Sequence, residues 1–166
     1  MGFRTSPGAP GAALACVCLA AAILGIVVAA AGATASGDGL RTMLTQINLV
    51  RAQRGLRPLA PDVRLMQAAQ RESEVLAGLG ILTHVGPDGD LGTRVRRFGY
   101  RYRLVEENLA AGIADPASVV NAWLRSPLHR ANLLRAGISS IGIGYAPQRR
   151  GILGPYWTLI LAEPAI

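Results

Sequence analysis

The sequence contains no lysine, and its cysteines and aromatic residues are few. All 17 basic residues are arginine, against 10 acidic residues. We attribute part of the net charge of +7 to codon bias, so this charge alone argues weakly for an anionic partner. Both cysteines, Cys16 and Cys18, lie near the N-terminus, and the chain beyond them must be stabilised by its core without disulfides. Charged residues make up 16% and hydrophobic residues 51%, which excludes intrinsic disorder.

The first 35 residues have the pattern of an export signal. Arg4 precedes an uncharged apolar stretch over residues 12–31, and Ala33-Thr34-Ala35 supplies the small residues that signal peptidase requires. This pattern predicts cleavage after Ala35 and a secreted chain that begins at Ser36. The stretch is also about as long as a membrane-spanning helix, so an uncleaved membrane anchor is the alternative.

The length of the chain predicts one domain after this segment. We expect residues 1–35 to be a signal peptide or N-terminal membrane anchor, residues 36–39 a short linker and residues 40–166 a single domain. The expected location is extracellular or in the cell envelope.

The hydrophobic periodicity predicts several helices followed by two strands, which is an α+β arrangement. Helices are expected over residues 40–54, 61–79, 91–98, 116–126 and 129–134. Strands are expected over residues 138–145 and 156–161, joined by a hairpin connection over residues 147–155.

The residues that could carry chemistry are two histidines and a pair of carboxylates. His84 lies in a loop that proline and glycine interrupt, and His129 follows Pro127. Glu106 and Glu107 are adjacent in an otherwise apolar stretch. In an extended segment successive side chains point to opposite faces, so only one of the two can point inward.

Five motifs in this order resemble the signatures of the CAP superfamily, which includes cysteine-rich secretory proteins, antigen 5 and plant pathogenesis-related proteins. The chain is most similar to the short secreted branch of bacteria. The motifs are Ala69 to His84, Gly99-Tyr100-Arg101-Tyr102, Val105 to Ala110, Trp123 to Leu134, and Ile141 to Tyr145 with Tyr156-Trp157-Thr158. The resemblance implies a three-layer α-β-α sandwich with a central antiparallel sheet and a cleft lined by two histidines and two acidic residues.

The resemblance also assigns the residues of this cleft. His84 and His129 match the two family histidines, and Glu107 matches one acidic residue. The second acidic position is Ser118 here, and Glu106 replaces the glycine that usually precedes the matched glutamate. His84, His129 and Glu107 are therefore the candidate metal residues, because two imidazoles with one nearby carboxylate suit Zn²⁺ or a similar divalent cation, weakly held.

These features leave the function open among three classes. The favoured hypothesis is an exported binding or envelope-interaction module, in which the cleft residues also serve as a hydrogen-bonded network. The alternatives are a weak metal-dependent peptidase or esterase with Glu107 as the candidate catalytic residue, and a lipid- or sterol-binding protein. The expected partner is an anionic polymer, lipid or protein of the envelope or exterior. Contact with the membrane is expected only through an uncleaved N-terminal segment.

An alternation of arginine and aromatic residues over residues 94–103 is a further candidate binding feature. Such a stretch can bind single-stranded nucleic acid by phosphate contact and stacking. In an exported protein we favour a solvated helix face and loop, with Phe98 and one tyrosine packed inward. A nucleic-acid partner is therefore not expected.

Overall fold

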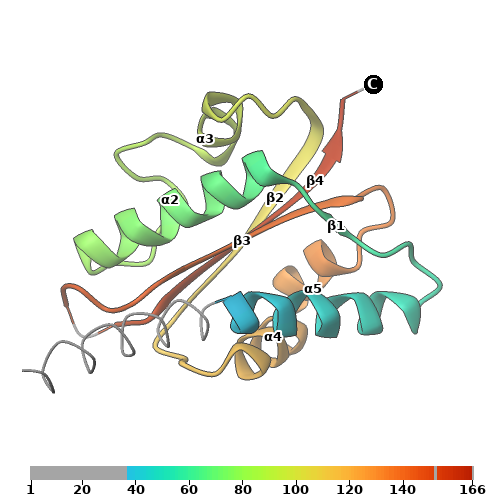
Figure 1. Ribbon diagram of the computed structural model, residues 1–166, viewed down its shortest axis with the longest axis horizontal. Coiled ribbons are helices and arrows are strands. Elements are labelled where there is room, and N and C mark those ends of the chain that lie inside the picture. The colour runs from blue at the N-terminus through green and yellow to red at the C-terminus, as the bar shows by residue number, and fades with distance from the viewer. Residues whose placement is uncertain (1–36, 152, 166) are drawn as a thin grey trace, which may run out of the picture. The chain divides into compact units, whose positions relative to one another are not determined.

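In the computed structural model, residues 37–151 and 153–165 are described, and two layers of helices cover a four-stranded sheet (Figure 1). The helices are residues 37–52, here called the N-terminal helix, α2 (Val63–Leu79), α3 (Leu91–Arg97), α4 (Pro116–Arg125) and α5 (Pro127–Leu133). The strands are β1 (Ala60–Pro61), β2 (Tyr102–Ala111), β3 (Ser140–Ala146) and β4 (Tyr156–Pro164). The predicted export segment lies outside the described residues.

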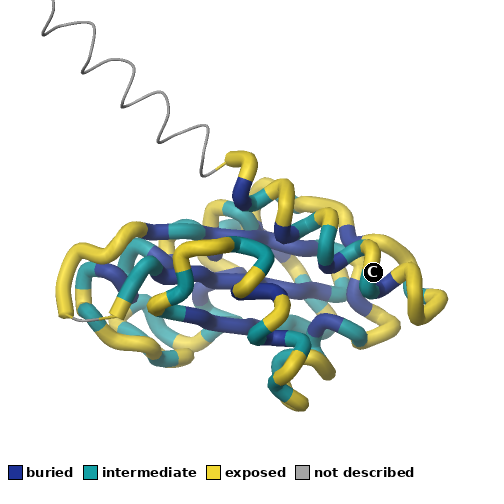
Figure 2. Tube along the Cα trace, turned by 90° about the horizontal axis from the view of Figure 1, so that it is seen from below, coloured by how far each residue is buried: buried dark blue, intermediate teal, exposed yellow. Residues whose placement is uncertain are grey.

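The strand order in the sheet is β1-β3-β4-β2. The three long strands are antiparallel, and the two-residue β1 adds a short parallel pair with β3. In Figure 1, α2 and α3 lie on one face of the sheet, while the N-terminal helix, α4 and α5 lie on the other. This is the expected α-β-α sandwich. Figure 2 shows the buried residues concentrated along the strands and on the helix sides that face them.

The strand β4 divides the core in two because its side chains alternate between the faces. Trp157, Leu159 and Leu161 pack with the N-terminal helix, α4 and α5, whereas Ile160 and Ala162 pack with α2 and α3. Glu107 is directly opposite Ile160 in the register of β2 and β4, so it shares the face of α2 and α3.

Local chemistry explains where the helices begin and how closely α2 approaches the sheet. The side chain of Asp62 accepts hydrogen bonds from the first turn of α2, and Asp115 does the same for α4. Helix α2 therefore begins after Asp62 and not at Pro61 as the sequence suggested. On β3, a Cβ at Gly142 or Gly144 would overlap the backbone of α2, so only glycine permits this packing.

The sequence pattern did not predict β1 or β2 as strands. β1 has only two residues, and β2 carries charged side chains on both faces, so neither shows a simple alternation of apolar and polar residues. Among the described residues, no helix is both long and apolar enough to cross a membrane.

Candidate functional site

The site is centred on a hydrogen bond between His84 and Glu107. His84 Nδ1 lies 2.8 Å from Glu107 Oε2, and the carboxylate is buried while the imidazole is 59% exposed. A carboxylate accepts, so His84 donates from Nδ1 and keeps its lone pair on Nε2. The exposed ring thus offers Nε2 to a ligand.

A buried arginine of α3 holds both members of this pair. Arg94 donates to Glu107 Oε1 through one terminal nitrogen, and through the other to the carbonyl oxygens of His84 and Gly89, at 3.0 and 2.9 Å. Its side chain is 2% exposed. A buried guanidinium with several fixed donors is well suited to orient a carboxylate. Arg94 therefore constrains the loop that carries His84 as well as the carboxylate that orients its ring.

A second carboxylate is buried behind Arg94. Glu72 of α2 is fully buried, and its Oε2 lies 3.1 Å from Arg94 Nε. Burial, with a smaller contribution from the charge of Glu107, raises the pKa of Glu72 to about 7 against the opposing attraction of Arg94. Two carboxylates thus share one buried guanidinium at the base of the site.

His129 is brought toward this cluster from the other helical layer. Asn108 of β2 donates to the carbonyl oxygen of His129 at 3.0 Å, and Asn132 donates to Asn108 Oδ1 at 2.9 Å. Burial lowers the pKa of the half-buried His129, and so does the charge of His84. The backbone of His129 is therefore tied to the strand that carries Glu107, and the pairing of the two imidazoles as ligands stays a prediction.

The other two assigned positions do not join the cluster. Ser118 is exposed in the first turn of α4, and its hydroxyl donates to Asp115 Oδ2 at 2.6 Å. Glu106 is on the opposite face of β2 from Glu107 and pairs with Arg135. The two adjacent carboxylates point to opposite faces as expected, but Glu106 is also largely buried, at 12% exposed, because helices cover both faces of the sheet, so the expectation that only one points inward is wrong.

These donors fit a divalent cation only as a partial coordination shell. Glu107 accepts from His84 through one oxygen and from Arg94 through the other, so it is placed to orient the His84 ring. Within residues 37–151 and 153–165, no group of three or more His, Cys, Asp or Glu is arranged to hold a metal ion. Two imidazoles completed by water suit a weakly held ion, whereas a closed structural zinc site requires four protein ligands.

The arginine and aromatic stretch is largely engaged within the protein. Arg94 is buried, Arg96 stacks on Tyr102 at 5.7 Å, and Arg97 pairs with Asp88. Tyr100 is buried in the core. The expectation that one tyrosine packs inward is confirmed, whereas the expectation of a solvated helix face is wrong for Arg94, which is buried against Glu72 and Glu107.

The sequence reasoning missed Glu72 and Arg94 as site residues, although a signal was present. Glu72 continues the buried stripe of α2, which includes Ala68, Ala69 and Leu76. Arg94 occupies the corresponding inward position of α3, next to Val95. A charged residue on the apolar stripe of a helix indicates a buried partner, and two such residues indicate a pair.

The fold and this arrangement define a class of protein, in which a helix-covered sheet carries a cluster of histidine and carboxylate side chains. The model of the cysteine-rich secretory protein family, CAP, matches residues 44–161, and the chain belongs to this family. A crystal structure of an extracellular protein with an SCP domain from Bacillus anthracis has a TM-score of 0.69 and 25% identity. An outer surface protein from Borrelia burgdorferi has a TM-score of 0.71 and 23% identity, which shows the common fold.

The uncharacterized protein YkwD of Bacillus subtilis is 33% identical over 112 residues, which is 67% of this chain. The chain spans only about two fifths of these longer relatives, 42% of YkwD and 41% of the B. anthracis chain. The match to the B. anthracis structure covers 76% of this chain. By contrast, the match to the B. burgdorferi outer surface protein covers 94% of that protein and 77% of this chain.

Proposed function

We propose that this chain is an exported binding protein whose cleft weakly holds a divalent cation, such as Zn²⁺, between His84 and His129. The observation that carries the proposal is the hydrogen bond from His84 Nδ1 to the buried Glu107, which leaves Nε2 as the available ligand atom. A bound cation would supply a positive centre with open positions for an oxygen of the partner. The expected partner is an anionic or carbonyl-bearing component of the envelope or exterior.

The environment of Glu107 favours binding over hydrolysis. A metal-dependent hydrolase needs a carboxylate free to take a proton from the attacking water. Glu107 has one oxygen bound by Arg94 and the other by His84. The position on α4 where the family carries a second acidic residue is Ser118 here. Its hydroxyl donates to Asp115, the residue that caps α4. A catalytic role would require a carboxylate that is only 2% exposed, and whose two oxygens already bind Arg94 and His84, to take up the proton.

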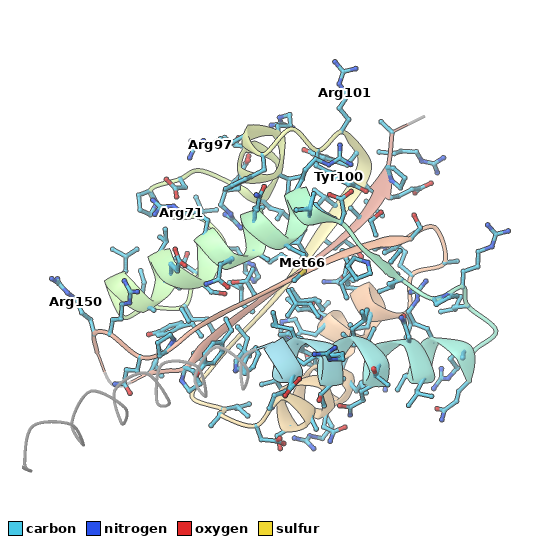
Figure 3. All side chains as sticks on the ribbon, in the orientation of Figure 1. Met66, Arg71, Arg97, Tyr100, Arg101 and Arg150 are labelled. Atoms are coloured by element: carbon cyan, nitrogen blue, oxygen red, sulfur yellow. The ribbon has the colours of Figure 1, made fainter. Side chains whose placement is uncertain are left out.

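The lipid-binding alternative has one observation in its favour. An apolar cavity of about 170 Å³ lies between the N-terminal helix and the sheet, lined by residues that include Leu44, Met66 and Ile143. Figure 3 places Met66 between these elements. This volume is below the roughly 300 to 1,000 Å³ of ordinary ligand pockets, so the cavity is small for a sterol.

Calorimetric titration with Zn²⁺ tests the cation proposal. The secreted form that begins at Ser36 should show one weak site at pH 7.5 that weakens at pH 5.5, because protons compete for the imidazoles. His84→Ala and His129→Ala should each abolish it. Leu128→Ala removes a 79% exposed side chain next to His129, and as the matched control it should bind as the wild type does.

A fourth variant tests why the site is weak. Ser118→Glu restores a carboxylate at the family position and should strengthen Zn²⁺ binding by roughly 10 to 100-fold, the usual effect of a residue that supports a metal ligand. Unchanged binding in both histidine variants would refute the site. If Ser118→Glu gives no gain, the missing carboxylate does not explain the weakness.

A further inference from the structure

Large apolar side chains are exposed along the segment that leads from α2 to His84. Leu79, Ile81, Leu82 and Val85, here called the apolar strip, are 46%, 48%, 45% and 66% exposed. They are half of the eight large hydrophobic residues that are exposed in the described part of the chain, and they fall within seven consecutive positions. Single exposed apolar residues are ordinary on a protein surface, but a local concentration of them marks an interaction site.

Two exposed arginines lie beside the apolar strip. The connection between β3 and β4 packs against Gly80, where an added Cβ would be 3.0 Å from the Arg150 backbone. This contact brings Arg149 and Arg150 next to the strip, and Figure 3 shows Arg150 projecting outward near the end of α2. Neither residues 79–87 nor residues 147–155 include an acidic residue. The surface is therefore apolar and cationic.

The chain enters the domain at this same end of the sandwich. A Cβ on Gly39 would be 3.1 Å from Pro116 and 3.8 Å from the Trp157 ring, and Gly112 donates to the Pro155 carbonyl at 3.1 Å. Gly39 is thus close to the base of the connection that carries the arginines. In the sequence it follows closely on the apolar export segment.

We propose that the apolar strip, with Arg149 and Arg150, docks this domain on an anionic lipid bilayer. Apolar side chains on protruding loops can enter the boundary between headgroups and acyl chains, while arginines bind the headgroup phosphates. The strip lines none of the three described cavities, of about 130, 480 and 170 Å³. A bilayer can bind a surface that has no cavity, whereas a protein partner that inserts a side chain needs a cavity to receive it.

Docking in this way would place the site next to the headgroups. Val85 directly follows His84 in the chain, and His84 is itself 59% exposed. The bilayer would then present phosphate-bearing molecules to the cleft. Docking by the strip requires neither a bound cation nor an intact pair of histidines.

Vesicle sedimentation of the secreted form tests the proposal without the N-terminal segment, since residues 35–166 form a compact unit of their own. The protein should bind vesicles of phosphatidylglycerol and phosphatidylcholine in the presence of a chelator, and should bind pure phosphatidylcholine more weakly. Arg149→Gln with Arg150→Gln should lower the partition coefficient about 30-fold. Ile81→Ser with Leu82→Ser should lower it at least about tenfold.

The matched control is Leu49→Ser with Val63→Ser, which removes two exposed apolar side chains outside the strip. This control should bind as the wild type does. The proposal is overturned if the wild type does not bind anionic vesicles, or if the arginine variant and the strip variant both bind normally. It is also overturned if the control loses as much binding as these variants do. Because the assay contains no free metal, its failure is distinct from failure of the cation proposal.

Discussion

The buried carboxylate of Glu72 should make the stability of the domain fall as the pH rises. Its pKa is raised from 4.5 to about 7 by burial, so the folded state keeps a proton that the unfolded chain releases in this range. The contribution is fully present below about pH 4.5 and is lost as the pH rises through 7. At about 1.4 kcal/mol per pKa unit, the full loss is about 3 kcal/mol.

Glu72→Gln replaces the carboxylate with a neutral group of nearly the same shape. The variant should match the wild type near pH 4.5 and should be more stable by up to about 3 kcal/mol at pH 8.5. Urea unfolding of both proteins between pH 4.5 and 8.5 measures the difference directly. Other groups titrate in both proteins, so the difference curve isolates this carboxylate.

Glu74→Gln on the same helix is the control for this experiment. Glu74 is only partly buried and accepts a hydrogen bond from Gln70 at 2.9 Å, so its replacement should not remove the pH dependence. Parallel curves for the wild type and Glu72→Gln would show that Glu72 carries the same charge in both states. A Glu72→Gln protein that is less stable at pH 8.5 would mean that the ion pair with Arg94 outweighs the cost of burial.

Two further measurements test the core and the predicted cleavage of the export segment. Trp123→Ala should lower the free energy of unfolding in urea by about 3 to 5 kcal/mol, because the side chain is 1% exposed and donates to the Leu109 carbonyl at 3.0 Å. A decrease below about 1 kcal/mol would contradict the place of Trp123 in the core. N-terminal sequencing of the secreted protein should give Ser36, and a membrane-bound product that retains Met1 would contradict cleavage.

The sequence predicted most of the helical layers because local signals determine them. Asp115 before Pro116 is a strong helix start, and α4 begins at Pro116 as expected. The last two strands were also predicted, since glycine alternates with large residues in β3 and β4 is rich in strand-forming residues. β2 was missed because the partners of its charged residues come from other elements, which a local pattern does not contain.

The candidate site residues come from family motifs, and their role in binding stays a prediction. His84, Glu107 and His129 were assigned from the resemblance; the structure joins the first two by a hydrogen bond, and Asn108, next to Glu107 in β2, donates to the carbonyl oxygen of His129. Arg94 and Glu72 lie on different helices, and the apolar stripe on which each falls indicates a buried partner without identifying it. Their burial depends on the packing of α2 and α3 on the sheet, which is a tertiary property.

The orientation of His84 depends on Arg94 and not on residues of α4. Arg94 bonds the carbonyl of His84 and also the carboxylate that the imidazole of His84 binds, so it constrains both the backbone and the ring. These contacts come entirely from the layer of α2 and α3, together with β2. Serine at position 118 therefore leaves the contacts among Arg94, Glu107 and His84 intact, and the weaker cation binding that we expect from it arises on the side of α4 and α5.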